Sequence, residues 1–175
     1  MENIVIAIIS IALIMGGTLT LLLSSLPSID TLSSSWKQMT HRTEDIRRTE
    51  IATDNWTVSD GGAKVEITIR NNGEVSLSDF ASWDVIAKYD SDNDTYAKWL
   101  PYTPSNPPEN NKWTVNGIYF SGNPETIEPN ILNPGEDMRI LMQLDPEVAD
   151  NTTNCATIST PNGITTQLIF QRGGT

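Results

Sequence analysis

Residue combinations that carry out acid–base, nucleophilic or redox chemistry are scarce in this 175-residue chain. The chain has one histidine, His41, and one cysteine, Cys155, so they cannot supply an internal disulfide or a Cys/His zinc site. Serines are common, but the G-x-S-x-G nucleophile elbow and the lysine of a phosphate-binding loop are both missing. We therefore expect His41 to be solvated on a helix, Cys155 to be a small buried residue, and the protein not to be an enzyme.

One acidic segment has the spacing of a metal site. Asp90, Asp92 and Asp94 place carboxylates at alternate positions, as at the start of an oxygen-ligand calcium loop. The match then fails, because Thr95 stands at the glycine position of an EF-hand and Pro101 at the position of its bidentate glutamate. An acidic hairpin tip is the simpler interpretation. No cofactor is required, and calcium, with ligands from another loop, is the one cofactor that the sequence suggests.

Three N-x-T sequons could accept glycans if the chain is exported. Their asparagines are Asn55, Asn93 and Asn151. All three fall near predicted turns or strand ends, where an oligosaccharide would have room, so we regard them as candidate glycosylation sites.

The most informative element is an apolar N-terminal segment. No charged side chain occurs between Glu2 and Asp30. About 20 apolar residues in a helix span roughly 30 Å, which is the thickness of a bilayer core. The basic n-region of a cleavable signal is missing, so we expect this segment to be retained, with Met1 as the first residue of the mature protein.

Past Pro27, apolar residues recur at an alternating three- and four-residue spacing, with charged residues between them, which predicts an amphipathic helix. We expect one helix over residues 1–52, kinked or locally melted near Pro27 because proline lacks a backbone donor.

Identical helices would pack along the apolar face of this helix, where small residues allow close approach. The alternative is a lone membrane span with a short stalk. The candidate assembly residues are Ile4, Ile8, Ile11, Gly16, Gly17, Leu21, Leu22, Ile29, Leu32, Trp36, Met39 and Ile46.

The remainder of the chain, residues 53–175, has a different composition and pattern. The whole chain has 22 acidic and 11 basic residues, and 5 and 4 of these lie in residues 1–52, which leaves 17 and 7 for this part. Such an acidic surface repels nucleic acid and anionic lipid. Short alternating runs separated by Gly, Asn and Pro turns predict an antiparallel sandwich of immunoglobulin-like type, and hence an α+β chain. The predicted strands are Asn55–Ser59, Lys64–Arg70, Trp83–Tyr89, Tyr96–Leu100, Lys112–Phe120, Met138–Leu144, Ala156–Thr160 and Thr165–Phe170.

Four segments of this β-rich part, together with the N-terminal helix, carry a family resemblance. They read VEITIRNNGEVSLSDF, WDVIAKYD, ILNPGEDMRILMQLD and TPNGITTQLIF. The chain resembles the archaellins, the filament subunits of the archaeal-type flagellum, and the anchored immunoglobulin-like stator proteins of the same machine look similar. Val5 stands where bacterial type IV pilins have a glutamate, which favours the archaellin side.

The resemblance implies a structural subunit of a motility filament. Such a subunit is processed by a prepilin-type peptidase, sits in the membrane before an assembly platform adds it to the filament, and then polymerises with itself through its N-terminal helix. Its place is then an extracellular filament at the cell surface. A stator protein of the same machine and an adhesive pilin are the alternatives.

Overall fold

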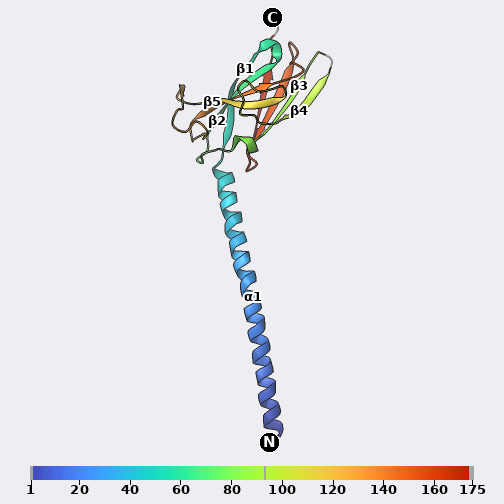
Figure 1. Cartoon of the computed structure of the whole chain (residues 1–175), viewed down its shortest axis with the longest axis vertical. Coiled ribbons are helices and arrows are strands. Elements are labelled where there is room, and N and C mark those ends of the chain that lie inside the picture. Colours follow the sequence, from blue (N-terminus) through green and yellow to red (C-terminus); the bar gives the residue numbers. More distant parts are fainter. Residues whose placement is uncertain (1, 93, 174–175) are drawn as a thin grey trace. The chain divides into compact units, whose positions relative to one another are not determined.

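The computed structural model describes residues 2–92 and 94–173, with the backbone alone for Glu2 and residues 22–29. The chain divides into two compact units, a helical unit (Met1–Glu44) and a β-domain (Asp45–Thr175) (Figure 1). The β-domain includes the last turn of the helix. The expected boundary at residue 52 therefore lies inside the observed β-domain.

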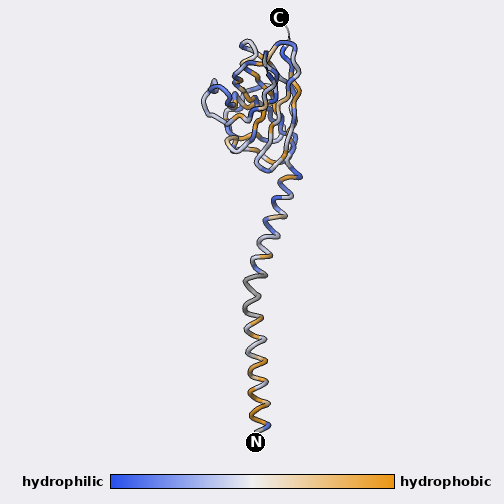
Figure 2. Tube along the Cα trace, turned by 90° about the vertical axis from the view of Figure 1, so that its right-hand side faces the viewer, coloured by the Kyte–Doolittle hydropathy of each residue, from blue (hydrophilic) through white to orange (hydrophobic). Residues whose placement is uncertain are grey.

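Helix α1 covers Glu2–Arg48 without interruption. Figure 2 shows apolar residues along its N-terminal half and mostly polar ones towards its end. The backbone is helical through Pro27, so the expected melting at residues 23–25 does not occur; proline removes one backbone donor, and the bonds on either side maintain the helix. The helix ends at Arg48 rather than at residue 52, because Ile51 already pairs with Asn71 in a sheet.

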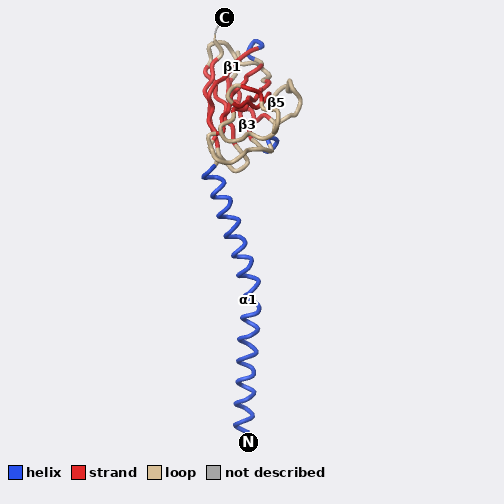
Figure 3. The backbone as a smooth tube through the Cα atoms, turned by 90° about the vertical axis from the view of Figure 1, so that its left-hand side faces the viewer, coloured by secondary structure: helices blue, strands red, loops and turns tan. Residues whose placement is uncertain are grey.

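In the described part of the β-domain, the chain forms nine strands, and Figure 3 shows the strands in red. They form a five-stranded sheet of order β1-β2-β7-β5-β6 and a four-stranded sheet of order β4-β3-β8-β9, and all strand pairs are antiparallel. This arrangement confirms the predicted α+β class and the antiparallel sandwich. The strands are β1 (Ile51–Ser59), β2 (Lys64–Asn71), β3 (Asp84–Asp90), β4 (Thr95–Leu100), β5 (Lys112–Phe120), β6 (Asn123–Pro124), β7 (Asp137–Gln143), β8 (Thr153–Ser159) and β9 (Thr165–Gln171).

The core lies between the two sheets, because each central strand alternates buried and outward residues. Trp113 of β5 is fully buried and its ring meets Tyr102 edge to face, at 5.0 Å between centroids. On the other sheet, the rings of Tyr89 and Tyr96 stack at 5.6 Å. Burial of each such side chain stabilises the fold by about 1.5–3 kcal/mol, so this one core accounts for the compactness of the domain.

Two edge strands meet at one side of the sandwich. The register of β1 shifts between Thr53 and Asn55, and the Thr53 hydroxyl donates to the Gln167 carbonyl of β9 at 3.3 Å. A bulge of this kind bends a strand, which here brings the β1 edge of one sheet to the β9 edge of the other. The two remaining edges belong to β6 and β4. Strand β6 is short and contains Pro124, whereas β4 is a regular six-residue edge.

Candidate assembly surface

The apolar half of α1 presents its side chains outward on every face. Within the described part of the chain, Asn3–Leu21 is the one segment long and apolar enough to cross a membrane, with a mean hydropathy of 2.5. The predicted assembly residues Ile4, Ile8 and Ile11 are each more than half exposed. Exposing such an apolar surface to water is unfavourable, so lipid or other protein is expected to cover it.

Several described hydroxyl groups on this helix donate to carbonyl groups of the helix itself. Ser10 donates to the Ile6 carbonyl at 2.9 Å, and Thr20 donates to the Gly16 carbonyl at 2.8 Å. The same bond, made to a carbonyl four residues back, recurs in the polar half, for example from Thr40 to Trp36 at 2.9 Å. Because these polar groups already have partners, the helix surface can be covered by apolar material at little desolvation cost.

The two glycines at the centre of this segment leave open space beside the backbone. A methyl group added to Gly16 or Gly17 would meet no atom within 4 Å. Another helix could therefore approach closely at this point, and a helix contact at these glycines stays a prediction. Leu21 is 71% exposed, and the side chain of its neighbour Leu22 lies outside the described residues.

The predicted apolar seam of the second half is present on one helix face. Leu32, Trp36 and Met39 are 59–66% exposed, and their spacing of four and three residues places them side by side. Ile46 is half-buried and belongs to the β-domain, while the side chain of Ile29 lies outside the described residues.

The last turn of α1 is bound tightly to the β-domain. The Arg48 carbonyl accepts from the Glu74 backbone at 2.8 Å, and the Arg48 guanidinium pairs with the Glu74 carboxylate at 3.1 Å. The Glu50 carbonyl accepts backbone hydrogen bonds from Asn72 and Gly73, at 2.9 and 3.0 Å. Gly73 is required here, because an added methyl group would lie 2.5 Å from the Arg48 carbonyl oxygen. The sequence showed an N–G turn at this position but not what packs against it.

The two described sequons have different surroundings. Asn55 is exposed in β1, and its side-chain oxygen accepts from the Trp56 backbone at 2.8 Å. Asn151 is exposed in a turn with φ 59°, a left-handed conformation that asparagine tolerates. Asn93 lies outside the described residues. Glycosylation at these positions stays a prediction.

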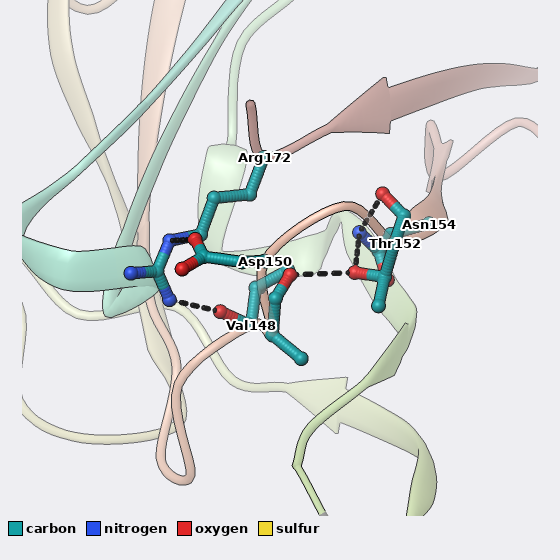
Figure 4. A network of polar contacts seen from close by, with 6 residues as sticks. Val148, Asp150, Thr152, Asn154 and Arg172 are labelled. Carbon is teal, nitrogen blue, oxygen red and sulfur yellow. Dashed lines mark hydrogen bonds and ion pairs between the residues drawn. The ribbon is translucent and has the colours of Figure 1, made fainter. Parts of the chain in front are cut away.

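The turn that contains Asn151 is held in place by a polar network (Figure 4). Arg172 pairs with the Asp150 carboxylate at 2.6 Å and donates to the Val148 carbonyl at 2.6 Å. Thr152 donates to the Ala149 carbonyl at 2.8 Å. These bonds fix the C-terminal end of β9 against the turn that precedes β8.

The acidic tip between β3 and β4 is a hairpin turn. Asp90 pairs with Thr95 across the strands, and the Thr95 hydroxyl donates to the Asp90 carboxylate at 2.6 Å. Throughout the described residues, no three histidine, cysteine, aspartate or glutamate side chains come together as a metal-binding group. Calcium at Asp90, Asp92 and Asp94 stays a prediction that needs ligands from elsewhere.

His41 and Cys155 belong to different units of the chain. His41 is exposed on α1, with its ring 4.0 Å from the Glu44 carboxylate. Cys155 was expected to precede a strand and to be buried, and both expectations are wrong. It lies within β8 on the outer face of its sheet and is half-exposed, because its neighbours Asn154 and Ala156 take the buried positions of the alternating strand.

Comparison with known proteins gives structural likenesses only. No family model matches the chain, and no curated protein matches it in sequence. Among solved structures, the archaellum periplasmic stator protein FlaG from Sulfolobus acidocaldarius superposes with a TM-score of 0.51 at 24% identity, over 70% of this chain and 99% of that one. A chain of the archaellum periplasmic stator protein complex of FlaF and FlaG from the same organism gives the same score and identity, over 70% of this chain and 89% of that one.

A flagellin is similar as well. The crystal structure of archaeal flagellin FlaB1 from Methanocaldococcus jannaschii gives a TM-score of 0.54 at 12% identity, over 73% of this chain and 91% of that one. At these identities the likeness establishes a shared fold. The neighbours are structural components of one machine, in agreement with the resemblance seen in the sequence. The chain therefore has the fold of archaellum components, common to a periplasmic stator protein and an archaeal flagellin.

Proposed function

We propose that this chain is an archaellum component of the stator type, anchored in the membrane by Asn3–Leu21 with its β-domain outside. The observation that carries the proposal is the length and placement of the apolar segment. It has 19 residues without a charge, and about 20 apolar residues make one bilayer span. Its function would be mechanical, without catalysis.

The second half of the helix supports an anchor rather than a filament core. Charged side chains surround the apolar seam from Lys37 onwards and are exposed, and Arg47 and Arg48 occupy the last turn. A helix surrounded by identical copies on every side would have to bury these charges, at a cost of several kcal/mol each. The likeness to FlaG, which covers 99% of that chain, points the same way.

A filament subunit is the second candidate, and specific observations favour it. The seam of Leu32, Trp36 and Met39 is exposed, and flagellin FlaB1 shares the fold. In this alternative the helix leaves the membrane and joins a self-assembled core, after processing by a prepilin-type peptidase and delivery through an assembly platform.

Fractionation of an archaellated archaeal host that expresses the tagged chain tests the proposal. A stator protein should remain in the membrane fraction after the filaments are sheared off, and it should be far less abundant than the flagellin. Ile11→Asp should release it from the membrane, because a carboxylate at the centre of a span costs about 2.5–3.5 kcal/mol. The matched control is Ile127→Asp, at a side chain 87% exposed in the β-domain, which should stay anchored.

Recovery of the chain as a stoichiometric subunit of the sheared filaments would overturn the stator assignment and establish the filament alternative. In that event Leu32→Asp should abolish filaments, whereas Ser34→Asp, on an already polar position of the same turn, should spare them. A chain found in the soluble fraction without Ile11→Asp would contradict both candidates.

A further inference from the structure

The side chains of Lys98, in β4, and Asn111, the residue before β5, meet although these strands belong to different sheets. The Lys98 ammonium donates to the side-chain oxygen of Asn111 at 3.1 Å, and both side chains are half-buried. Lys98 is paired with Ala87 of β3 in its own sheet. The Asn111 backbone donates to the Gln143 carbonyl of β7, in the other sheet, at 2.8 Å. The contact therefore joins the two layers of the sandwich.

The backbone of Asp145 contacts both of these side chains. Its carbonyl accepts a hydrogen bond from the Lys98 ammonium, and its N–H donates to the side-chain oxygen of Asn111 at 3.2 Å. Because an ammonium and a backbone N–H can only donate, the atom that faces them is the oxygen of the Asn111 amide and not its nitrogen. The orientation of the amide is thus fixed, and its carbon lies one bond of about 1.2 Å from the oxygen that Lys98 contacts.

Further contacts hold the lysine and the Asp145 turn in place. The Lys98 nitrogen lies 5.2 Å from the centre of the Tyr96 ring, on which the Tyr89 ring stacks. The Asp145 carboxylate accepts from the Asn110 side chain at 3.0 Å. An amine and an amide are therefore kept in contact, and such positioning of two reacting groups can equal an effective concentration of about 10⁵–10⁸ M.

From this geometry we propose that Lys98 and Asn111 form a covalent isopeptide bond between the two sheets. The neutral amine of Lys98, after giving one proton to solvent, attacks the side-chain carbon of Asn111. The Asn111 oxygen then carries negative charge, which the N–H of Asp145 stabilises. The bond between that carbon and the Asn111 side-chain nitrogen breaks, and the nitrogen takes a second proton from Lys98 and leaves as ammonia. Ammonia takes up a proton from water, so ammonium is released and nothing is oxidised or reduced.

The half-exposure of the two side chains suits this reaction, because water can accept the first proton and ammonia can leave. The product would join β4 to the start of β5 and enclose the proline-rich connection between them. A stator protein and a filament subunit would both gain from such a bond, since tension that opens hydrogen bonds does not separate it.

Mass spectrometry of the full-length chain, purified in detergent from a host that does not glycosylate it, tests the proposal. Loss of ammonia should lower the intact mass by about 17 Da. Trypsin cleaves after lysine and arginine, so it should cut the unlinked chain after Lys88, Lys98 and Lys112. In the linked chain the new amide blocks Lys98. Residues 89–112 should then be recovered as one peptide that lacks the mass of ammonia.

Two variants should restore the full mass and the cut after position 98. Lys98→Arg keeps the charge and the tryptic site, but a guanidinium stays protonated and does not attack the amide. Asn111→Gly removes the amide and suits the backbone, which has a φ of 58°. The matched control is Lys88→Arg, at an exposed position of β3, which should keep both the mass loss and the block at Lys98.

A folded parent chain of full mass, cut normally after Lys98, would overturn the proposal, and so would a mass loss that persists in Lys98→Arg. A succinimide at an Asn–Gly pair such as Asn116-Gly117 loses the same mass but leaves Lys98 open to trypsin, so that pattern would also contradict the isopeptide bond. The parent chain itself carries the decisive signal, so the outcome does not depend on how well the variants fold.

Discussion

The side-chain amide of Asn162 donates a hydrogen bond of 2.7 Å to the hydroxyl of Thr49. That hydroxyl donates in turn to the Asp45 carbonyl in the last helical turn, at 2.6 Å, and Thr49 is only 5% exposed. One threonine thus joins the end of α1 to the turn before β9, more than a hundred residues later. The contact lies within the β-domain and explains why that domain includes the last turn of the helix.

Thr49→Val should destabilise the β-domain by about 1–3 kcal/mol. The substitution keeps the shape of the side chain, but it leaves the amide of Asn162 and the Asp45 carbonyl without their partner in a part-buried place. Thermal or denaturant unfolding, followed by circular dichroism, measures the loss. Thr57→Val, at an exposed position of β1, serves as the control and should be close to neutral; equal stability of the two variants would contradict the role of Thr49.

Gly73→Ala should destabilise the β-domain, although it adds only one methyl group. The new methyl group would lie 2.5 Å from the Arg48 carbonyl oxygen and 2.6 Å from the Glu50 nitrogen, so the turn must move away from the helix end. Overpacking against backbone costs about 1–3 kcal/mol. Gly173→Ala meets no atom within 4 Å and is the matched control. Hydrogen exchange at the amides of Asn72 and Glu74 should accelerate in the first variant and not in the second.

Tyr89 should make the β-domain sensitive to alkali. Burial, with smaller contributions from Asp145 and Tyr96, raises the pKa of Tyr89 to about 12, from 10.0. The folded state therefore disfavours the phenolate, so the stabilisation is complete below about pH 10 and is lost as the pH rises towards 12. Among the described residues its hydroxyl has no hydrogen-bond partner.

Tyr89→Phe should consequently be neutral or slightly stabilising at pH 7 and should lose less stability between pH 10 and pH 12 than the parent. Urea unfolding at a series of pH values measures both effects. Tyr119→Phe, on the outer face of β5, should keep the alkaline loss of the parent. A large loss of stability from Tyr89→Phe at pH 7 would mean that the hydroxyl has a partner.

Gly16→Leu separates the two candidate functions. Leucine is favourable in a bilayer and finds open space at this position, so a membrane anchor should insert as well as the parent. In a filament core the added side chain would hold neighbouring helices apart and shorten or abolish filaments. Membrane flotation and electron microscopy of sheared material measure the two outcomes. Normal long filaments built from this variant would show that Gly16 is not at a helix contact.

The sequons predict discrete mass increments. If Asn151 and Asn55 carry glycans, the intact mass of the protein from its native host should exceed the sequence mass. Asn151→Gln and Asn55→Gln should each remove one increment. The bare polypeptide mass would remove the glycan prediction for all three sequons, including Asn93.

Local signals predicted most of the strands, and long-range contacts explain what was missed. Alternation located eight of the strands, for example Val65, Ile67 and Ile69, which are all fully buried. The start of β1, Ile51-Ala52, was assigned to the helix, because its pairing with β2 is not visible in the local sequence. Strand β6 has two residues, too few for any period.

The outer face of the β4-β3-β8-β9 sheet was missed for a related reason. In β9, Leu168, Ile169 and Phe170 are successive apolar residues, so alternation cannot tell which of them faces outward. Only the pairing of Cys155 with Ile169 and of Ile86 with Trp99 shows that these residues share one surface. The register between strands that are distant in sequence depends on the packing of the whole sandwich, so it cannot be read from local patterns in a single sequence.

The attachment of β1 to the helix end determines how the β-domain responds to pulling. Tension transmitted along α1 enters β1 at Ile51, where the strand begins, and β1 is paired with β2 along its length, from Ile51 with Asn71 to Ser59 with Lys64. If the opposite end of the domain, near Ser59 and Arg172, is held by a partner, the force runs parallel to the strands. The hydrogen bonds of the ladder are then sheared together instead of being opened one at a time, so the domain can transmit tension without unravelling from its first strand.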